Sequence, residues 1–287
     1  MHLMSFKGEI LTAFFSPTGT TQKIIKAFTE ELVKVMNHQL TANEPKFIDF
    51  TPMSERAAIN GPSEIRIGSE ELFILGLPVY AGRVPNVLLP YLNCLRGDKT
   101  KTIIVAVYGN RHFDDALMEL WQILNTNGFD VIAAGAFIGE HAFSEVLAKG
   151  RPDIGDIQVC KQFARQVAEK LEKGDAKQLE QSDIPGNWPL RPYYKPVDSS
   201  GNAFDFRRII PCTLDTCIDC GLCADVCPVQ SISHVNNRTI IGICIKCCAC
   251  VKRCPVSAKQ FDDTNFILHK KELEFGFSSR KIPEYFV

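Results

Sequence analysis

The sequence has no hydrophobic run that reaches the roughly 20 residues needed for a transmembrane helix. It also has no excess of charge of either sign, because 32 Lys and Arg face 33 Asp and Glu, for a net charge of −1. This balance gives no electrostatic footprint of nucleic-acid binding. The first residues contain Lys7 and Glu9 and lack the apolar stretch and cleavage site of a secretory signal. We therefore expect a cytoplasmic protein with no membrane span and no nucleic-acid partner.

The overall composition is that of a globular protein. Of its 287 residues, 45% are hydrophobic and 23% are charged, which excludes a wholly disordered or fibrous chain. The length suffices for one large domain or two smaller ones.

Residues 1–174 alternate between strand-like and helix-like segments. Apolar runs predict strands at residues 10–15, 47–50, 71–77, 102–108 and 131–138. Apolar residues at helical spacing predict helices at residues 20–36, 85–95, 114–126 and 157–171. This alternation favours a parallel sheet covered by helices on both faces.

Three further segments follow this domain of residues 1–174. Residues 175–210 are rich in Pro and read as a semi-rigid connector. Residues 211–260 form a cysteine-rich module, and residues 261–287 are a tail with several Phe that we expect to pack on one of the domains.

Cysteine is abundant, with 12 residues, and ten of them lie between Cys212 and Cys254. A disulfide scaffold belongs to short secreted chains, so this crowding indicates metal binding instead. The spacing C-x2-C-x2-C-x3-C-P occurs twice, and one constant offset relates the two copies at every position. The copies are Cys217, Cys220, Cys223 and Cys227, and then Cys244, Cys247, Cys250 and Cys254.

This module resembles the bacterial two-cluster ferredoxins, in which the fourth Cys of each motif ligates the other cluster. The resemblance implies two [4Fe-4S] clusters, one held by Cys217, Cys220, Cys223 and Cys254, and one held by Cys244, Cys247, Cys250 and Cys227. Structural zinc is the alternative, but it favours two Cys pairs separated by a longer gap. Cys212 and Cys248 are left over, and we expect them to be small buried hydrophobes.

The module has five basic residues against three acidic ones, and the basic set is Arg238, Lys246, Lys252, Arg253 and Lys259. Cations near a cluster stabilise its reduced, more negative state and raise its potential. The alternative is that these residues are ordinary solvated surface charge.

The turn Ser16-Pro17-Thr18-Gly19-Thr20-Thr21 follows the first predicted strand and opens the first helix. Backbone N–H groups and the helix dipole at such a turn attract phosphate, and hydroxyls add neutral donors. No Lys follows Gly19 as in a P-loop, and there is no G-x-G-x-x-G motif. By itself the turn therefore leaves two interpretations open, a monophosphate site or a Thr-rich helix cap.

Two further loops are expected at the same sheet edge, because ligands of doubly wound sheets bind beyond the carboxyl ends of the strands. The first is Pro78-Val79-Tyr80-Ala81-Gly82-Arg83 and the second is Tyr108-Gly109-Asn110-Arg111-His112-Phe113-Asp114. With these motifs, the N-terminal segment, up to about the end of the last predicted helix, resembles a short-chain flavodoxin-like domain. The whole chain is similar in order and length to the flavodoxin–ferredoxin fusion proteins of anaerobes.

That resemblance implies an α/β flavodoxin-like fold, with a doubly wound five-stranded parallel sheet in the order 2-1-3-4-5, joined to a small α+β ferredoxin domain. It also implies FMN. The phosphate would be bound by Ser16, Thr18, Gly19, Thr20 and Thr21. The flavin ring would lie between the two later loops, against Pro78, Val79, Tyr80, Ala81, Gly82, Tyr108, Gly109, Asn110 and Asp114.

Arg83 or Arg111 would stabilise the reduced flavin under this resemblance. The alternative is that either Arg pairs with Asp114 or Asp115. His112 is expected to be a solvated loop residue, and a wall formed by Glu140 and His141 is a further hypothesis.

The two halves together predict an electron-transfer flavoprotein, in which clusters carry single electrons and FMN accepts one or two. The alternative is an FMN-dependent reductase acting directly on a small acceptor such as a quinone or a nitro compound. A non-catalytic redox sensor is less favoured, because no signalling module is attached. The expected partners are a redox protein that donates or accepts electrons, and a homodimer if one chain holds its flavin and clusters far apart.

Overall fold

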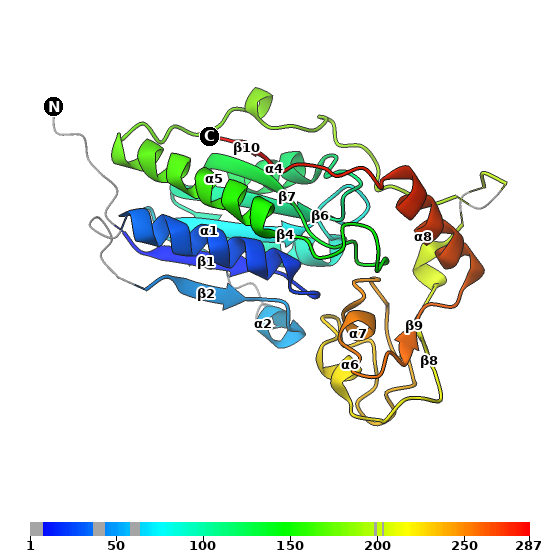
Figure 1. The fold of residues 1–287 in the computed structure, drawn as a ribbon. Helices are drawn as coiled ribbons and strands as arrows, with labels where there is room; N and C mark the ends of the chain where they lie inside the picture. The colour runs from blue at the N-terminus through cyan, green and yellow to red at the C-terminus, as the bar shows by residue number, and fades with distance from the viewer. Residues whose placement is uncertain (1–7, 37–43, 58–63, 198–199, 203) are drawn as a thin grey trace.

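The computed structural model describes residues 8–36, 44–57, 64–197, 200–202 and 204–287. In this described part of the chain, the main sheet has six strands in the order β10-β7-β6-β4-β1-β2 (Figure 1). The strands are β1 (Ile10–Phe14), β2 (Lys46–Asp49), β4 (Leu72–Pro78), β6 (Thr100–Tyr108), β7 (Phe129–Ile138) and β10 (Glu284–Phe286). Within it, β2-β1-β4-β6-β7 are parallel, which is the flavodoxin-like doubly wound arrangement.

The predicted count of five strands was wrong, because the C-terminal tail adds β10. This strand pairs antiparallel with the edge strand β7, with Tyr285 opposite Gly135. A three-residue strand is too short to show an alternating pattern in the sequence. Its partner, the edge of β7, exists only once the sheet has formed.

Helices cover both faces of the sheet, as the sequence predicts. Helices α1 (Thr20–Met36) and α5 (Ile154–Glu172) lie on one face, and α4 (Ala116–Thr126) lies on the other (Figure 1). Residues of β1 alternate between the two layers: Ile10 and Phe14 pack with α1 and α5, whereas Leu11 and Ala13 pack on the α4 side. Because both faces are covered, the central strands contain long apolar runs, such as residues 103–107 of β6.

The helix predicted at residues 85–95 is replaced by three short elements. They are a 3-10 turn at Asn86–Leu88, α3 (Leu89–Leu92) and β5 (Leu95–Gly97), and β5 pairs in parallel with β3 (Ile65–Ile67). Pro90 explains the break, since its ring nitrogen cannot donate the hydrogen bond that a continuous helix needs. Helix α2 (Met53–Ala57) completes the helices in the described residues of this half.

The cysteine-rich module is a small unit of two short helices, α6 (Leu222–Asp225) and α7 (Ala249–Lys252), with a β8 (Cys212–Thr213) and β9 (Lys259–Gln260) ladder. The sequence repeat is also a backbone repeat. Asp219 and Lys246 stand at equivalent positions, with φ of 53° and 55°. Two further pairs related by the same offset share the left-handed conformation, namely Gly221 with Cys248 and Gln230 with Ser257.

The connector and the tail both contact the flavodoxin-like half. The connector, with short turns at Gln181–Asp183 and Phe206–Arg208, is held by a hydrogen bond from Tyr193 Oη to the Val84 carbonyl (2.8 Å). The tail forms α8 (Thr264–Gly276) beside the module and then returns to the sheet edge as β10 (Figure 1). None of the helices in the described residues is long and apolar enough to cross a membrane.

Candidate flavin cavity and iron–sulfur sites

The turn after β1 is shaped by its own backbone and hydroxyl groups. Ser16 Oγ accepts a hydrogen bond from the Gln22 amide (2.9 Å), and Gly19 has a φ of 89°. The Gly19 amide bonds to the Ser16 carbonyl (3.2 Å), which closes the turn onto the start of α1. The partial positive charge at this turn therefore comes from main-chain N–H dipoles and not from a charged side chain of the turn. Such a turn can bind a phosphate through neutral donors.

A large cavity of about 910 Å³ opens at this turn. It is bounded by the three predicted loops, the connector, the cysteine-rich module and α8. Twelve of the predicted flavin residues line it: Ser16, Thr18, Thr20, Thr21, Pro78, Val79, Tyr80, Ala81, Gly82, Tyr108, Gly109 and Arg111. Gly19, Arg83, Asn110 and Asp114 are not among its lining residues.

Arg83 is committed to a different role. Its guanidinium donates to both carboxylate oxygens of Glu119 (2.8 and 2.7 Å) and to the Arg191 carbonyl (2.5 Å). Its ion-pair partner is therefore Glu119 and not Asp114 or Asp115. Asp115 pairs instead with Arg191 of the connector (2.6 Å). Arg83 thus holds the connector through the Arg191 carbonyl and does not line the cavity, and its predicted role toward a flavin stays a prediction.

Asn110 is buried and fully occupied by the tail. Its Nδ2 donates to the carbonyls of Phe277 (2.6 Å) and Ser279 (2.9 Å), and its Oδ1 accepts from the Lys281 amide (3.2 Å). The side chain holds the loop after β6 to the C-terminal tail, and its predicted bond to a flavin stays a prediction.

The two flavin loops are locked to each other around Gly82. A Cβ atom at Gly82 would lie 2.4 Å from Asp114 Oδ2, and its φ is 78°. Asp114 also pairs with Arg111, as the alternative interpretation of that Arg expected. The Arg111 guanidinium lies over the ring of Tyr194 (5.1 Å). Only glycine meets both the steric and the backbone demand here.

Residues from distant segments complete the far wall of the cavity. These are His141 and Phe143 after β7, Tyr194 of the connector, Phe206 of the turn before the module, and His269 of α8. Burial is the main cause that lowers the pKa of His141 to about 4, with contributions from His269 and Lys252. Its ring is therefore neutral at pH 7, with Nδ1 accepting from the Phe143 amide (3.2 Å). Glu140 and His141 line the cavity, where the sequence hypothesis places a wall. No local motif marks Phe143, Tyr194, Phe206 or His269, since only the fold brings them together.

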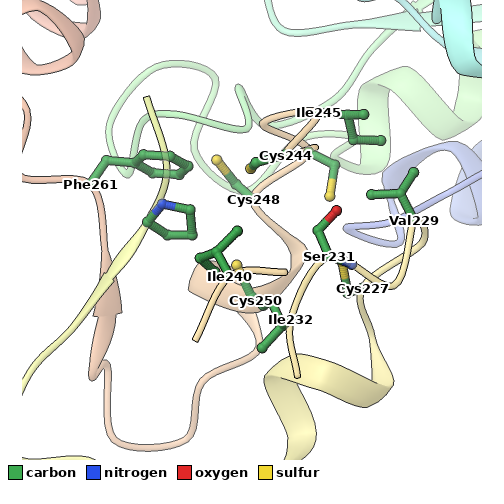
Figure 2. Close-up of a pocket in the computed structure, with 12 residues that line it drawn as sticks. Cys227, Val229, Ser231, Ile232, Ile240, Cys244, Ile245, Cys248, Cys250 and Phe261 are labelled. Carbon is green, nitrogen blue, oxygen red and sulfur yellow. The ribbon is translucent and has the colours of Figure 1, made fainter. Parts of the chain in front are cut away.

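The eight repeat cysteines gather into two small pockets in the combinations implied by the ferredoxin resemblance. The inner pocket is lined by Cys227, Cys244, Cys247 and Cys250 (Figure 2). The outer pocket is lined by Cys217, Cys220, Cys223 and Cys254. In each pocket, the Cys before Pro comes from the other repeat. Among the described residues, no group of three or more His, Cys, Asp or Glu could hold a single metal ion. A set of four thiols is the donor set of a [4Fe-4S] cluster.

The two pockets differ in their surroundings. Cys247 and Cys250 of the inner pocket are buried, whereas Cys220 of the outer pocket is exposed. Burial raises the pKa of the Cys250 thiol to about 12. For Cys254, burial also raises the pKa, but main-chain N–H groups of residues 256–259 lower it more, so its net pKa is below the usual value.

Cys248 is buried as the sequence suggests, but it lies at the inner pocket as a fifth thiol (Figure 2). Its Sγ donates to the Lys246 carbonyl (3.6 Å). Cys212 is half-buried and lies on β8.

The inner pocket adjoins the large cavity. Cys244 and Cys247 line both. The module is held there by Lys252 Nζ, which donates to the Ser144 carbonyl (2.6 Å), and by Arg56, which donates to the Pro228 carbonyl. The candidate flavin site and one candidate cluster site are thus neighbours within a single chain.

Residues 214–233 match the 4Fe-4S binding domain family. This match confirms the expected iron–sulfur module and supports at least one [4Fe-4S] cluster. The chain has no match among curated protein sequences.

Solved structures similar to the first half include two flavodoxins. One, from Streptococcus pneumoniae TIGR4, is 15% identical, with a TM-score of 0.37, over 57% of this chain and 99% of its own. Flavodoxin 2 from Bacillus cereus is 19% identical, with a TM-score of 0.40, and the match covers 57% of this chain and 99% of that flavodoxin. An FMN-dependent NADH-azoreductase from Bacillus anthracis is 13% identical, with a TM-score of 0.36, and the match covers 57% of this chain and 99% of the azoreductase. At these scores, the fold assignment rests on the strand order described above.

Proposed function

We propose that this protein is an iron–sulfur flavoprotein that transfers electrons between two [4Fe-4S] clusters and FMN. Clusters carry single electrons, whereas FMN accepts one or two, so the chain couples one-electron to two-electron redox steps. The observation that carries this proposal is that Cys244 and Cys247 line both the inner pocket and the large cavity. Since both sites belong to one chain, this transfer does not depend on a homodimer.

FMN would be held by the three loops at the carboxyl edge of the sheet. Its phosphate would sit at Ser16, Thr18, Thr20 and Thr21, where hydroxyls and main-chain N–H groups converge. The ring would lie against Tyr80 and Gly109, because these belong to the two loops that line the cavity together with the cysteine-rich module.

The outer pocket would serve as the entry or exit point for electrons. Cys220 is exposed, so a redox protein partner can approach this cluster directly. The outer and inner pockets share the packed pair α6 and α7, which carry Cys223 and Cys250. Electrons would therefore pass between partner, outer cluster, inner cluster and FMN.

Anaerobic purification followed by iron, sulfide and flavin analysis tests the proposal. We expect about eight iron, about eight sulfide and one FMN per chain, as two cubane clusters require. Iron far below this value would contradict the two-cluster assignment. Clusters without flavin would leave a ferredoxin module joined to an α/β domain of another function.

A second candidate is direct reduction of a small acceptor by the flavin. It is favoured by the cavity volume of about 910 Å³, which is near the upper end of the roughly 300–1,000 Å³ range of ligand pockets. Phe143, Tyr194 and Phe206 would give an aromatic acceptor a wall to stack on. Steady oxidation of the reduced protein by a quinone or a nitroaromatic would support this function. Oxidation of the reduced protein by redox proteins alone would support the first function, electron transfer between protein partners.

A further inference from the structure

The ammonium group of Lys246 is buried without a carboxylate partner. Lys246 is 7% exposed. Within the described residues, its Nζ donates to the carbonyls of Arg207 (2.7 Å) and Cys244 (2.9 Å) and forms no ion pair. Its Nζ also lies over the ring of Phe206, 5.9 Å from the ring centroid, and this aromatic face is neutral. A buried cation is costly unless an anion compensates it, so a negative group that the polypeptide does not supply is expected beside it.

Lys246 lies where two anionic cofactors would meet. It lines the large cavity. It also stands between Cys244 and Cys247, which line the inner pocket as well as the cavity. A cation at this wall is close to both a flavin in the cavity and a cluster in the pocket.

The internal repeat shows that the turn itself does not require a lysine. Asp219 occupies the equivalent position in the other half, with nearly the same φ. Both residues make the same contact: the Asp219 amide donates to Cys217 Sγ (3.4 Å), and the Lys246 amide donates to Cys244 Sγ (3.5 Å). Asp219 is exposed and faces no flavin cavity. The lysine is therefore found in the half of the module that faces the candidate flavin site.

The arginines suggested by the sequence do not supply this buried positive charge. Arg83 is paired with Glu119, and Arg111 is paired with Asp114. Among the other basic residues at the cavity, Lys195 is exposed and Arg207 pairs with Asp205 (3.0 Å).

We propose that Lys246 electrostatically links FMN to the inner cluster. One-electron reduction adds one negative charge to the cluster. Two-electron reduction of FMN with uptake of one proton also adds one negative charge. The Lys246 ammonium stabilises both products and so raises both potentials. This inference rests on the proposed function, because it requires both cofactors to be bound.

Redox titration of the anaerobic holoprotein tests the link. In Lys246→Met, we expect the flavin midpoint and one cluster midpoint to fall, each by about a tenfold change in the reduction equilibrium. That is about 59 mV for the one-electron cluster couple and about 30 mV for the two-electron flavin couple. The midpoint potential of the other cluster should not change. Lys246→Arg, which keeps the positive charge, should have the flavin and cluster midpoints of the wild type.

Two variants at other positions serve as controls, one at Asp219 and one at Lys259. Asp219→Asn removes a charge at the equivalent turn and should leave the flavin midpoint unchanged. Lys259 is also buried, and its Nζ donates to Thr213 Oγ1 (2.6 Å) and to the Asn237 carbonyl (2.7 Å) at the outer pocket. Lys259→Met should lower a cluster midpoint but leave the flavin unaffected, because Lys259 does not line the cavity.

Unmoved midpoints in Lys246→Met, with iron and FMN at wild-type content, would overturn the link. A shift of the cluster alone would overturn it as well. If Lys246→Met fails to assemble, Lys246→Gln removes the charge but keeps an N–H donor for the carbonyls, and the same outcomes decide. Absence of FMN or of about eight iron in the wild-type protein would instead overturn the proposed function.

Discussion

The amide of Asn110 donates to the Phe277 carbonyl at 2.6 Å, across 167 positions of sequence. This bond ties the second flavin loop to the tail that emerges from α8. The tail thereby supports this loop from the far end of the chain, and its helix α8 lines the cavity through His269 and Leu273.

Asn110→Ala should lower the free energy of unfolding by about 1–3 kcal/mol, because it removes three hydrogen bonds that the buried Asn110 side chain makes with the tail. It should also reduce FMN retention, since the loop loses its anchor. Chemical unfolding and flavin content measure both effects. Gln166→Ala is the control, because its bond to Tyr285 Oη is exposed. Equal effects of the two variants would contradict the anchoring role.

Gly82→Ala should destabilise the protein more than Gly150→Ala. The two glycines have similar φ, 78° and 75°, so the backbone cost, about 1 kcal/mol, is shared. A Cβ at Gly82 meets Asp114 at 2.4 Å, whereas one at Gly150 meets nothing within 4 Å. Thermal unfolding of both variants isolates the steric contact. A similar loss of stability in both would show that the two loops are not locked at Gly82.

His141 should make the protein less stable in acid. Its pKa is lowered to about 4, chiefly by burial, against about 6.5 in an unfolded chain. Between these values the unfolded state binds more protons, so this stabilising contribution is complete above about pH 6.5 and is lost as the pH falls through 4.

The size of the His141 effect is up to about 3 kcal/mol. Urea unfolding at pH 7.5 and pH 5, followed by fluorescence of the buried Trp121, measures it. His141→Gln should have a shallower pH dependence than the wild type. His112→Gln is the matched control, because His112 is half exposed. An unchanged slope in His141→Gln would show that another group titrates.

The two-cluster assignment predicts unequal effects of cysteine substitutions. Cys247→Ser should prevent binding of the inner cluster and leave about four iron atoms per chain. Cys248→Ala should keep about eight, since Cys248 is not part of either repeat motif. Iron and sulfide analysis with cluster spectroscopy reads out both. Loss of a cluster in Cys248→Ala would make Cys248 a ligand.

Much of this protein is determined by local sequence. The spacing of the repeat cysteines resembles that of two-cluster ferredoxins, and this resemblance implied that Cys254 and Cys227 cross between the halves. The period of apolar residues placed α1 and the parallel strands, since burial of both sheet faces requires continuous apolar runs.

Tertiary structure decided the roles that depend on distant partners. The sequence suggests that Arg83 and Asn110 contact a flavin. In the structure, Arg83 forms an ion pair with Glu119, and Asn110 donates hydrogen bonds to carbonyls of the tail. Lys246 looks like surface charge, yet it is buried at the candidate flavin cavity, where its Nζ contacts the Arg207 carbonyl and the Phe206 ring. Whether a polar side chain is solvated, paired or left facing a cofactor depends on which segments fold against it, and local sequence carries no record of those contacts.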